Sequence, residues 1–352
     1  MKKAVLASAV LAVMASGSTL AAEVYNSEGT SLKIGGRAEF RGDFIGNSGK
    51  EIEGTMANKS RFRINVGGET QITDNLTGFG FYEAEQGVAS TGDKKAETAL
   101  KQRYMYAGIG TQFGDISFGK QDTAGVQISQ MSDAGQIWTG GQKAFINAGN
   151  EQINNTIAYA NTFADAVNVK ASAILGSEKN TNGYGLSGIY ATPIGLDIGL
   201  GYAMNDVNKD ELRGSNATTN GSANQVIGGL SYAIAGLTVG GTYTQGTYDF
   251  DTSADYDYRG VELSGTYKFD NGFRLMAAYA KAEIEGKGAG ENKFSKDDFI
   301  ELTGQYHFNK SLRTYLSYKI DNRNKDDYAS IDASKITYDI ENTVRLGLRY
   351  DF

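Results

Sequence analysis

Residues 61–75 read RFRINVGGETQITDN, in which polar and apolar side chains alternate up to a polar turn. Alternation with a period of two is typical of a β-strand that separates two different environments. The same pattern recurs at residues 300–308 and 344–352. In the first of these strands Phe62, Ile64 and Val66 share one face, and Arg61, Arg63, Asn65 and Glu69 share the other.

The composition of the 352-residue chain favours an all-β protein, because it holds 46 glycines and 21 tyrosines but only one proline. The absence of cysteine excludes disulfides, zinc–thiolate sites and thiol catalysis. A single histidine leaves little room for a metal cluster, so we expect neither a metal nor a cofactor. The formal net charge of −7 argues against binding to nucleic acid.

The first 21 residues have the three parts of a secretory signal peptide. Lys2 and Lys3 form a charged start, residues 4–15 are apolar, and Thr19 and Ala21 place small residues before a cleavage site. We therefore expect cleavage after Ala21 and export from the cytoplasm, the alternative being a buried N-terminal helix. Loss of the two lysines would change the net charge from −7 to −9.

Residues 22–352 are expected to form one domain, because no Pro- or Ser-rich linker interrupts them. Counting strands from Leu32 onward gives 16, and short turns alternate with long polar connections. An even-numbered antiparallel meander of this kind predicts a transmembrane β-barrel. The short turns are expected at 73–75, 114–115, 192–195, 270–272 and 309–311, and the long connections at 46–58, 87–98, 206–223, 284–297 and 322–335.

One uncharged run, residues 225–248, is long enough to be mistaken for a membrane helix. Six glycines and a turn-like sequence at 234–236 favour two strands instead.

A soluble β-sandwich, a β-propeller and a two-domain chain are alternative folds. A propeller would show a repeat of about 40–50 residues, and the sequence has none. Aromatic residues gather where predicted strands meet turns, as at Tyr267 and Phe269 and at Tyr306 and Phe308. Such positions form the interfacial girdles of a membrane barrel, so the barrel is favoured over the sandwich.

One predicted connection, Lys120–Gln152, spans 33 residues and carries apolar side chains such as Ile128, Met131 and Trp138. A barrel of 16 strands is too wide for side chains alone to fill, so water occupies its lumen. We therefore expect the loop at about 120–152 to fold inward and constrict the lumen. The alternative is that it caps the outer mouth.

Basic residues lie on the polar faces of the early strands, at Arg37, Arg63 and Arg103. A charge that faced lipid at mid-membrane would cost about 2–4 kcal/mol, so these side chains are expected to face the lumen. Asp133, in the long loop, is the first candidate for an acid opposite them, and Asp122 is the second. Such charges predict a narrow aqueous gap that screens solutes by size and charge. The alternative is that the arginines only make the lumen wall hydrophilic.

Four stretches carry a resemblance over nearly the whole chain: AEVYN at 22–26, RINVGGETQITDNLTGFGFYE at 63–83, GDISFGK at 114–120 and VRLGLRYDF at 344–352. They resemble the general trimeric porins of Gram-negative outer membranes, and the Vibrio-type branch in particular. The resemblance implies a 16-stranded homotrimeric barrel among outer-membrane lipid and lipopolysaccharide that passes small hydrophilic solutes. The terminal Phe352 resembles the signal that the barrel assembly machinery recognises.

The same resemblance places the family's basic constriction cluster on Arg37, Arg63 and Arg103 and its loop aspartate on Asp133. Enteric members carry Pro-Glu-Phe-Gly-Gly in this loop, whereas residues 136–141 here read QIWTGG, so the loop glutamate is absent. The position of a fourth family arginine falls near Gln152, and Lys143 is its candidate substitute.

Other functions have weaker support. His307 lies near Ser311 and Asn309, but these two are expected in a turn, so we expect no enzyme. The acidic run at 248–257 lacks the glycine and terminal glutamate of an EF-hand. We expect a passive diffusion channel with a mild preference for cations, and a barrel acting as adhesin or receptor through its outer loops is the alternative.

Overall fold

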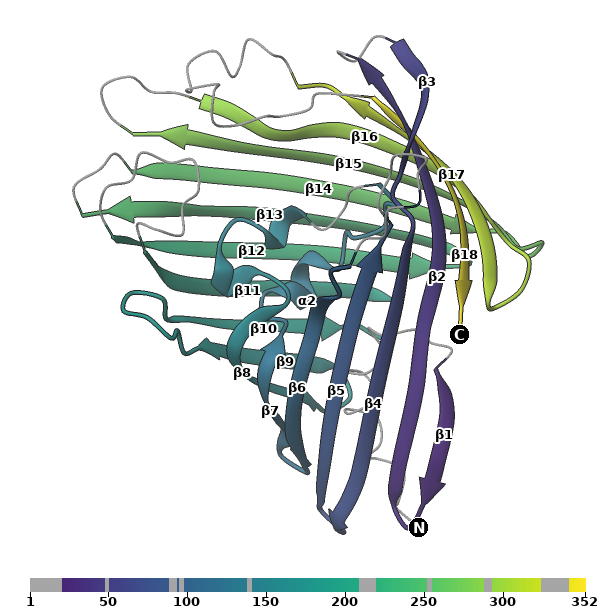
Figure 1. The fold of residues 1–352 in the computed structure, drawn as a ribbon. Coiled ribbons are helices and arrows are strands. Elements are labelled where there is room, and N and C mark those ends of the chain that lie inside the picture. Colours follow the sequence, from purple (N-terminus) through teal and green to yellow (C-terminus); the bar gives the residue numbers. More distant parts are fainter. Residues whose placement is uncertain are drawn as a thin grey trace.

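The computed structural model describes residues 21–47, 51–88, 94, 98–137, 141–208, 220–251, 255–287, 293–323 and 342–352. In these residues the chain forms an antiparallel β-barrel with one long loop inside it (Figure 1). The predicted signal peptide lies outside the described residues except for Ala21, so it remains a prediction, as does the domain boundary at residue 22.

The barrel consists of long strands joined mostly by short turns at one rim. The strands of the first half are β1 (Ala22–Ser27), β2 (Thr30–Asn47), β3 (Glu51–Asn58), β4 (Arg61–Thr73), β5 (Leu76–Gly87), β6 (Lys101–Thr111), β7 (Gly114–Gln121), β8 (Ile153–Phe163) and β9 (Val167–Ile174). Those of the second half are β10 (Gly183–Ala191), β11 (Leu196–Val207), β12 (Gly221–Ile234), β13 (Leu237–Phe250), β14 (Tyr256–Lys268), β15 (Phe273–Gly286), β16 (Lys293–His307), β17 (Leu312–Asp321) and β18 (Thr343–Asp351).

The barrel closes at β2. One edge of β2 pairs with β18 above and with β1 below, and the other edge pairs with β3 above and β4 below. Backbone hydrogen bonds between Gly36 and Phe352, at 2.9 and 3.1 Å, complete the seam. Because β1 continues the line of β18 and β3 that of β4, the 18 strands of the described residues occupy 16 positions around the barrel. The predicted 16-stranded barrel is confirmed.

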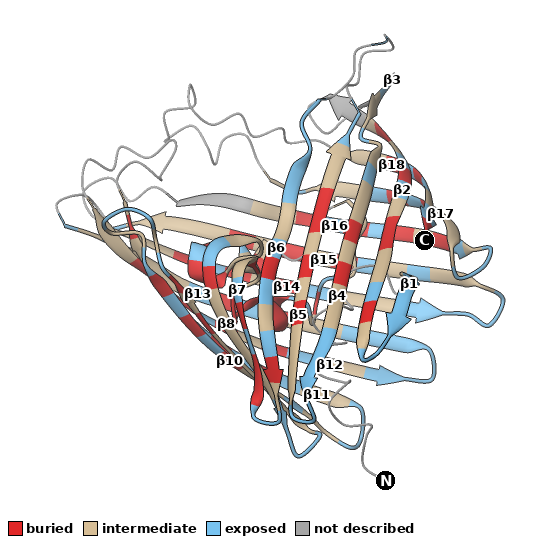
Figure 2. Ribbon diagram, turned by 60° about the horizontal axis from the view of Figure 1, so that its bottom comes forward, coloured by how far each residue is buried: buried red, intermediate tan, exposed pale blue. Residues whose placement is uncertain are grey.

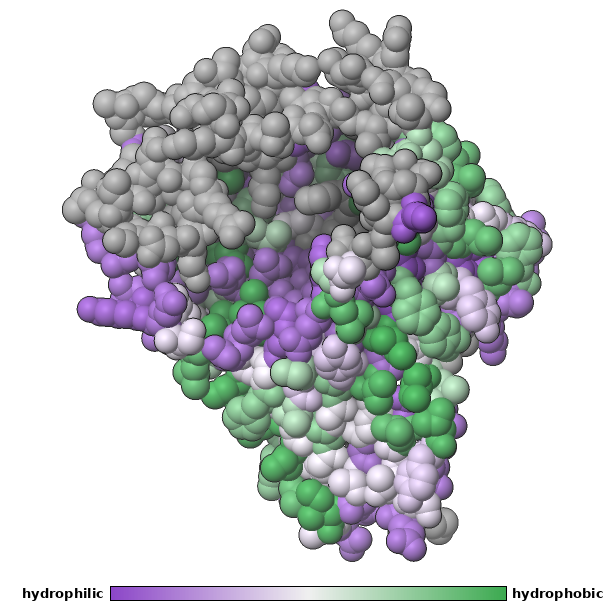
Figure 3. Space-filling model, in the orientation of Figure 1, coloured by the Kyte–Doolittle hydropathy of each residue, from purple (hydrophilic) through white to green (hydrophobic). Residues whose placement is uncertain are grey.

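Side chains alternate between a polar inner face and an apolar outer face. Figure 2 shows the accompanying alternation of buried residues with less buried ones along several strands. On β16, Glu301 and Thr303 are buried, whereas Ile300 and Leu302 are 38% and 50% exposed. Hydrophobic residues accordingly cover much of the outer surface in Figure 3. This inverts the arrangement of a soluble protein and suits a barrel with hydrocarbon outside.

The side chains of the outer face change in character at both edges of the apolar band. At the rim with short turns, Tyr267 and Phe269 stack edge to face at 4.7 Å between ring centroids, and Tyr306 and Phe308 do so at 5.1 Å. Toward the opposite rim, the outward positions of β14 and β15 turn charged, and Arg259 bonds Glu283 at 2.9 Å. The predicted aromatic girdle therefore lies at one interface, and ion pairs begin at the other.

The run at 225–248 forms parts of β12 and β13 with a turn at Ala235 and Gly236, as predicted. The long connections are shorter than predicted. Residues 51–58 form β3, and parts of 284–297 extend β15 and β16. Above the apolar band both faces of a strand contact water. A strand there can pair with its neighbour without alternating polar and apolar side chains, so the alternation does not reveal it. The turn predicted at 114–115 lies at 112–113 instead. Among the described residues no helix is long and apolar enough to cross a membrane.

Placing arginine on the outer face should destabilise the barrel. Leu302→Arg puts a charge in the apolar band, and we expect the free energy of unfolding in phospholipid vesicles to fall by about 2–4 kcal/mol. The matched control is Met276→Arg, because Met276 lies on the inner face of β15, opposite Thr303. Urea unfolding of both variants measures the difference. Equal losses would contradict the assignment of the two faces.

Candidate pore constriction

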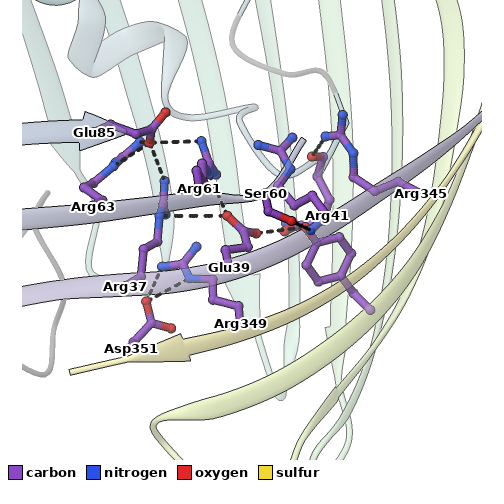
Figure 4. Close-up of polar contacts among 12 residues, drawn as sticks. Arg37, Glu39, Arg41, Ser60, Arg61, Arg63, Glu85, Arg345, Arg349 and Asp351 are labelled. Atoms are coloured by element: carbon purple, nitrogen blue, oxygen red, sulfur yellow. Dashed lines mark hydrogen bonds and ion pairs between the residues drawn. The ribbon is translucent and has the colours of Figure 1, made fainter. Parts of the chain in front are cut away.

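A band of charged side chains lies on the inner face of β2, β4, β5 and β18 (Figure 4), and Arg103 of β6 joins it through Glu83. Arg37 and Arg63 are direct cross-strand neighbours, and Arg63 is in turn opposite Glu85. Two like charges that face each other across neighbouring strands repel, so a nearby carboxylate is needed to offset the repulsion between Arg37 and Arg63. The three predicted arginines, Arg37, Arg63 and Arg103, are thus brought onto one wall.

Each of these arginines is paired to glutamates of the same wall. Glu85 Oε2 lies 2.6 Å from Arg63 and 3.8 Å from Arg37. Glu83 Oε1 lies 2.7 Å from Arg103 and 3.3 Å from Arg63. Charge-assisted hydrogen bonds fix Arg63 and Arg103 against the wall, whereas Arg37 lies only within ion-pair distance of Glu85 and its Nε is buried without a hydrogen-bond partner. The wall is therefore a network of alternating charges rather than a row of free cations.

Further ion pairs extend the network on both sides. Glu39 accepts a hydrogen bond from Arg61 Nε at 2.7 Å, and the Tyr315 hydroxyl donates to it at 2.8 Å. Arg345 donates two hydrogen bonds to the Asp43 carboxylate, at 2.6 and 2.7 Å. The second geometry is bidentate, which fixes orientation as well as distance.

The long loop lies inside the barrel. β7 ends at Gln121 and β8 begins at Ile153, so the loop covers residues 122–152, two residues shorter at its start than predicted and with Gln152 included. Within it lie the short helix α2 (Val126–Ser129) and the 3₁₀ turns η1 (Gly141–Lys143) and η2 (Asn147–Gly149). Residues 138–140, with the predicted Trp138, lie outside the described residues.

Apolar side chains of the loop pack on strands where the wall carries glycine. A Cβ at Gly199 or Gly229 would lie 2.8 Å from the sulfur of Met131, and one at Gly240 would overlap the Met131 carbonyl. Ile128, fully buried, packs against Gly199 and Gly229. The missing side chains leave room for the loop to approach the wall. The alternative that this loop caps the outer mouth is therefore wrong.

Two buried carboxylates of the wall also hold the loop, because they accept hydrogen bonds from its backbone. Glu301 accepts from the N–H groups of Gln136 and Ile137, at 2.6 and 3.0 Å. Glu262 accepts from the Ser132 hydroxyl at 3.1 Å and from the N–H of Gly141 at 3.2 Å. These bonds satisfy backbone donors that the loop would otherwise bury without partners.

The three other predicted site residues occupy different places on the loop. Asp133 is exposed at the tip, where Lys143 Nζ lies 3.9 Å from its carboxylate. Lys143 lies closer to Glu151, at 3.1 Å. Asp122 lies at the base of the loop and accepts hydrogen bonds from the Tyr104 hydroxyl at 2.9 Å and the Gln152 N–H at 3.1 Å. Burial, and then the charge of Glu151, raises the pKa of Asp122. Asp122 therefore fixes the loop base and Asp133 lines an open cavity, whereas the Lys143 side chain is largely buried beside Glu151.

Several members of this charged network were not identified from the sequence. Arg61 was placed on the polar face but not assigned to the constriction, and its partners Glu39 and Glu85 were not singled out. The alternation of polar and apolar residues indicates that these side chains face inward. It does not indicate the strand register, and the register decides which carboxylate pairs with which arginine.

The weaker candidates form no site in the described residues. Asn309 accepts hydrogen bonds from the N–H groups of Ser311 and Leu312, so its side chain closes the turn. His307 lies 3.0 Å from the Gln305 amide oxygen. Across the part of the chain that the structure describes, no group of three or more His, Asp or Glu side chains could hold a metal ion.

Comparison with known proteins gives matches over nearly the full length. The family model described as Gram-negative porin matches residues 7–350. Outer membrane protein U of Vibrio vulnificus is 33% identical over 372 residues, covering all of both chains. Among solved structures, Salmonella typhi OmpF in complex with daunomycin superposes with a TM-score of 0.77 at 20% identity, covering 94% of this chain and all of that one. The trimer form of Vibrio cholerae OmpT gives 0.69 at 20% identity, covering 92% and 99%.

Removing one carboxylate that holds the loop should loosen the constriction. Glu301→Ala leaves the N–H groups of Gln136 and Ile137 without their acceptor, so we expect a larger single-channel conductance and noisier open-channel current in planar bilayers. Gln305→Ala is the control, because Gln305 faces inward on the same strand and bonds His307 rather than the loop. An unchanged conductance in Glu301→Ala would contradict the role given to these bonds.

Proposed function

Since the chain belongs to the Gram-negative porin family, we propose that its water-filled lumen passes small hydrophilic solutes and ions with a mild preference for cations. The protein is a general porin of the outer membrane, a non-enzymatic channel for passive diffusion. One observation supports the proposal of a selective constriction. The long loop is held inside the barrel, opposite a wall of paired charges. Such an eyelet leaves a polar gap that sorts solutes chiefly by size.

The mild ion preference follows from how the arginines are compensated. Free guanidinium groups at a constriction would attract anions, but Arg37, Arg63 and Arg103 all share glutamates. Asp133 and Glu151 add carboxylates on the loop. The mature chain is expected to carry a net charge of −9, which draws cations to the mouths. We assign Arg37, Arg63, Arg103, Asp133 and Lys143 to the constriction, with Asp122 supporting the loop base.

We propose a homotrimer as the assembly. The solved OmpT relative is in a trimer form. On this chain, an apolar groove of about 540 Å³ opens on the outer face where β18, β2 and β4 meet. Contact with a second copy would cover these side chains. The groove is lined by Phe40, Phe62, Leu312, Leu348 and Tyr350 among others.

The remaining partners stay proposals. The outward ion pair of Arg259 with Glu283 lies just beyond the apolar band, at the height of lipid headgroups, where lipopolysaccharide phosphates would meet it. Phe352 stacks on Phe62 at 6.0 Å between centroids, and recognition by the assembly machinery would precede that contact. The adhesin or receptor alternative rests on acidic outer loops that lie largely outside the described residues, so it stays a prediction.

Reversal potentials in a KCl gradient test the ion preference. We expect a cation-to-anion permeability ratio slightly above one. A unit charge about 10 Å from a permeating ion contributes about 0.4 kcal/mol in water, so Asp133→Asn should shift the ratio toward anions by about twofold or more. Glu85→Gln should shift it the same way, because three arginines share that carboxylate.

Glu23→Gln is the control, because Glu23 lies exposed on β1, away from the constriction. Strong anion selectivity of the unaltered protein would contradict the sign of the preference. An unchanged ratio in Asp133→Asn would remove Asp133 from the eyelet.

Swelling of liposomes in a series of sugars of graded size tests passive diffusion itself. We expect rates that fall smoothly with solute size and do not saturate with concentration. The same preparation in planar bilayers separates the alternatives, because a receptor-only barrel would give no voltage-independent conductance.

A further inference from the structure

A second group of basic side chains lies on the inner face near the rim with short turns, and it adjoins the charged network of the constriction because Arg349 pairs across strands with Glu39 (Figure 4). It consists of Lys268, Arg274, Arg313 and Arg349, which we call the basic floor. Lys268 pairs across strands with Arg274, and Arg313 pairs with Arg349. Adjacent strands lie about 4.8 Å apart, so these charges form a row along β14–β18.

The basic floor carries more positive than negative charge. Asp351 is bonded by Arg349 at 2.6 Å and lies 3.3 Å from Arg313. Within the described residues Lys268 and Arg274 make no ion pair, and the Nε of Arg313 is buried without a hydrogen-bond partner. Like charges in a row are costly in the absence of a counter-ion. The floor therefore carries more positive charge than its ion pairs with Asp351 offset.

A cavity of about 370 Å³ lies between the floor and the tip of the constriction loop. Three of its lining residues are the cations Lys268, Arg274 and Arg313, and Asp133 lines it from the loop. The rest of the lining is mostly neutral and able to hydrogen bond. It includes Thr238, Ser264, Thr266, Gln136 and Gln305.

This arrangement has a defined polarity. A phosphate or carboxylate is attracted to the cations of the floor, whereas Asp133 repels it and accepts hydrogen bonds from hydroxyl groups instead. A solute with an anionic group at one end and hydroxyl groups at the other therefore matches the cavity in one orientation. Hydroxyl and amide side chains along the lining add sites for the same hydroxyl groups.

We propose that the basic floor is a weak binding station for hydroxylated anions, with sugar phosphates as the solute class, on the side of the constriction toward the short turns. The inference rests on the proposed open lumen and goes beyond it, since simple sieving requires no station. It also agrees with the proposal of a mild cation preference, because the positive floor opposes that preference. A station here would retain an anionic solute that has passed the eyelet.

Current recordings of the whole channel in planar bilayers test the proposal, with glucose 6-phosphate as the probe and glucose as the uncharged comparison. We expect concentration-dependent current interruptions with glucose 6-phosphate and none with glucose at the same concentration. The double variant Lys268→Gln/Arg274→Gln should weaken the association constant at least tenfold. Arg274→Lys should retain most of it.

Lys179→Gln is the control, because Lys179 is an exposed lysine in the turn between β9 and β10, outside the basic floor and its cavity. Unaltered interruptions in the double variant, or equal interruptions by glucose, would overturn the station. Inorganic phosphate binding as tightly as glucose 6-phosphate would overturn the role of the hydroxyl-binding lining. The conductance in KCl alone reports the proposed function separately, because a channel that conducts normally but is never interrupted contradicts only the station.

Discussion

The structure depends on the closure of its hydrogen-bond ladder at β2. In hydrocarbon an unpaired backbone N–H or C=O costs several kcal/mol, so a sheet that spans a membrane can have no free edge. Here β18 and β1 together cover one edge of β2, and the terminal Phe352 bonds Gly36 within that seam. Closure around 16 positions forces one face outward to lipid and gives the other face a lumen too wide to fill with side chains.

The long loop narrows this lumen, and the wall has two separate devices for holding it. Glycines at Gly199, Gly229 and Gly240 let the loop approach closely, and the carboxylates of Glu262 and Glu301 accept hydrogen bonds from it. On the other wall the arginines share glutamates, so their positions are fixed and their field is reduced. We therefore propose that the constriction sets a size limit firmly and an ion preference weakly.

The fold could be predicted from the sequence because alternation and turn spacing are local, and the inward direction of Arg63 followed from the same pattern. The ion-pair partners of Arg63 could not be predicted. Counting back from the two-residue turn between β4 and β5 would place Arg63 opposite Gln86, but a bulge between Gln71 and Thr73 shifts the register to Glu85. The carboxylates that bind the loop were beyond prediction for a related reason, since Glu301 and Gln136 are 165 residues apart. The site residues taken from resemblance lie on the loop and wall, and their roles remain proposals.

The central claim is that one face of each strand borders hydrocarbon and the other borders water, and cysteine scanning tests it most directly. The chain has no cysteine, so each introduced thiol is the only one. Along β14, a membrane-impermeant maleimide should label cysteines at 264, 266 and 268 in outer-membrane vesicles and spare those at 263 and 265. Labelling that shows no alternation, or the opposite alternation, would contradict the account.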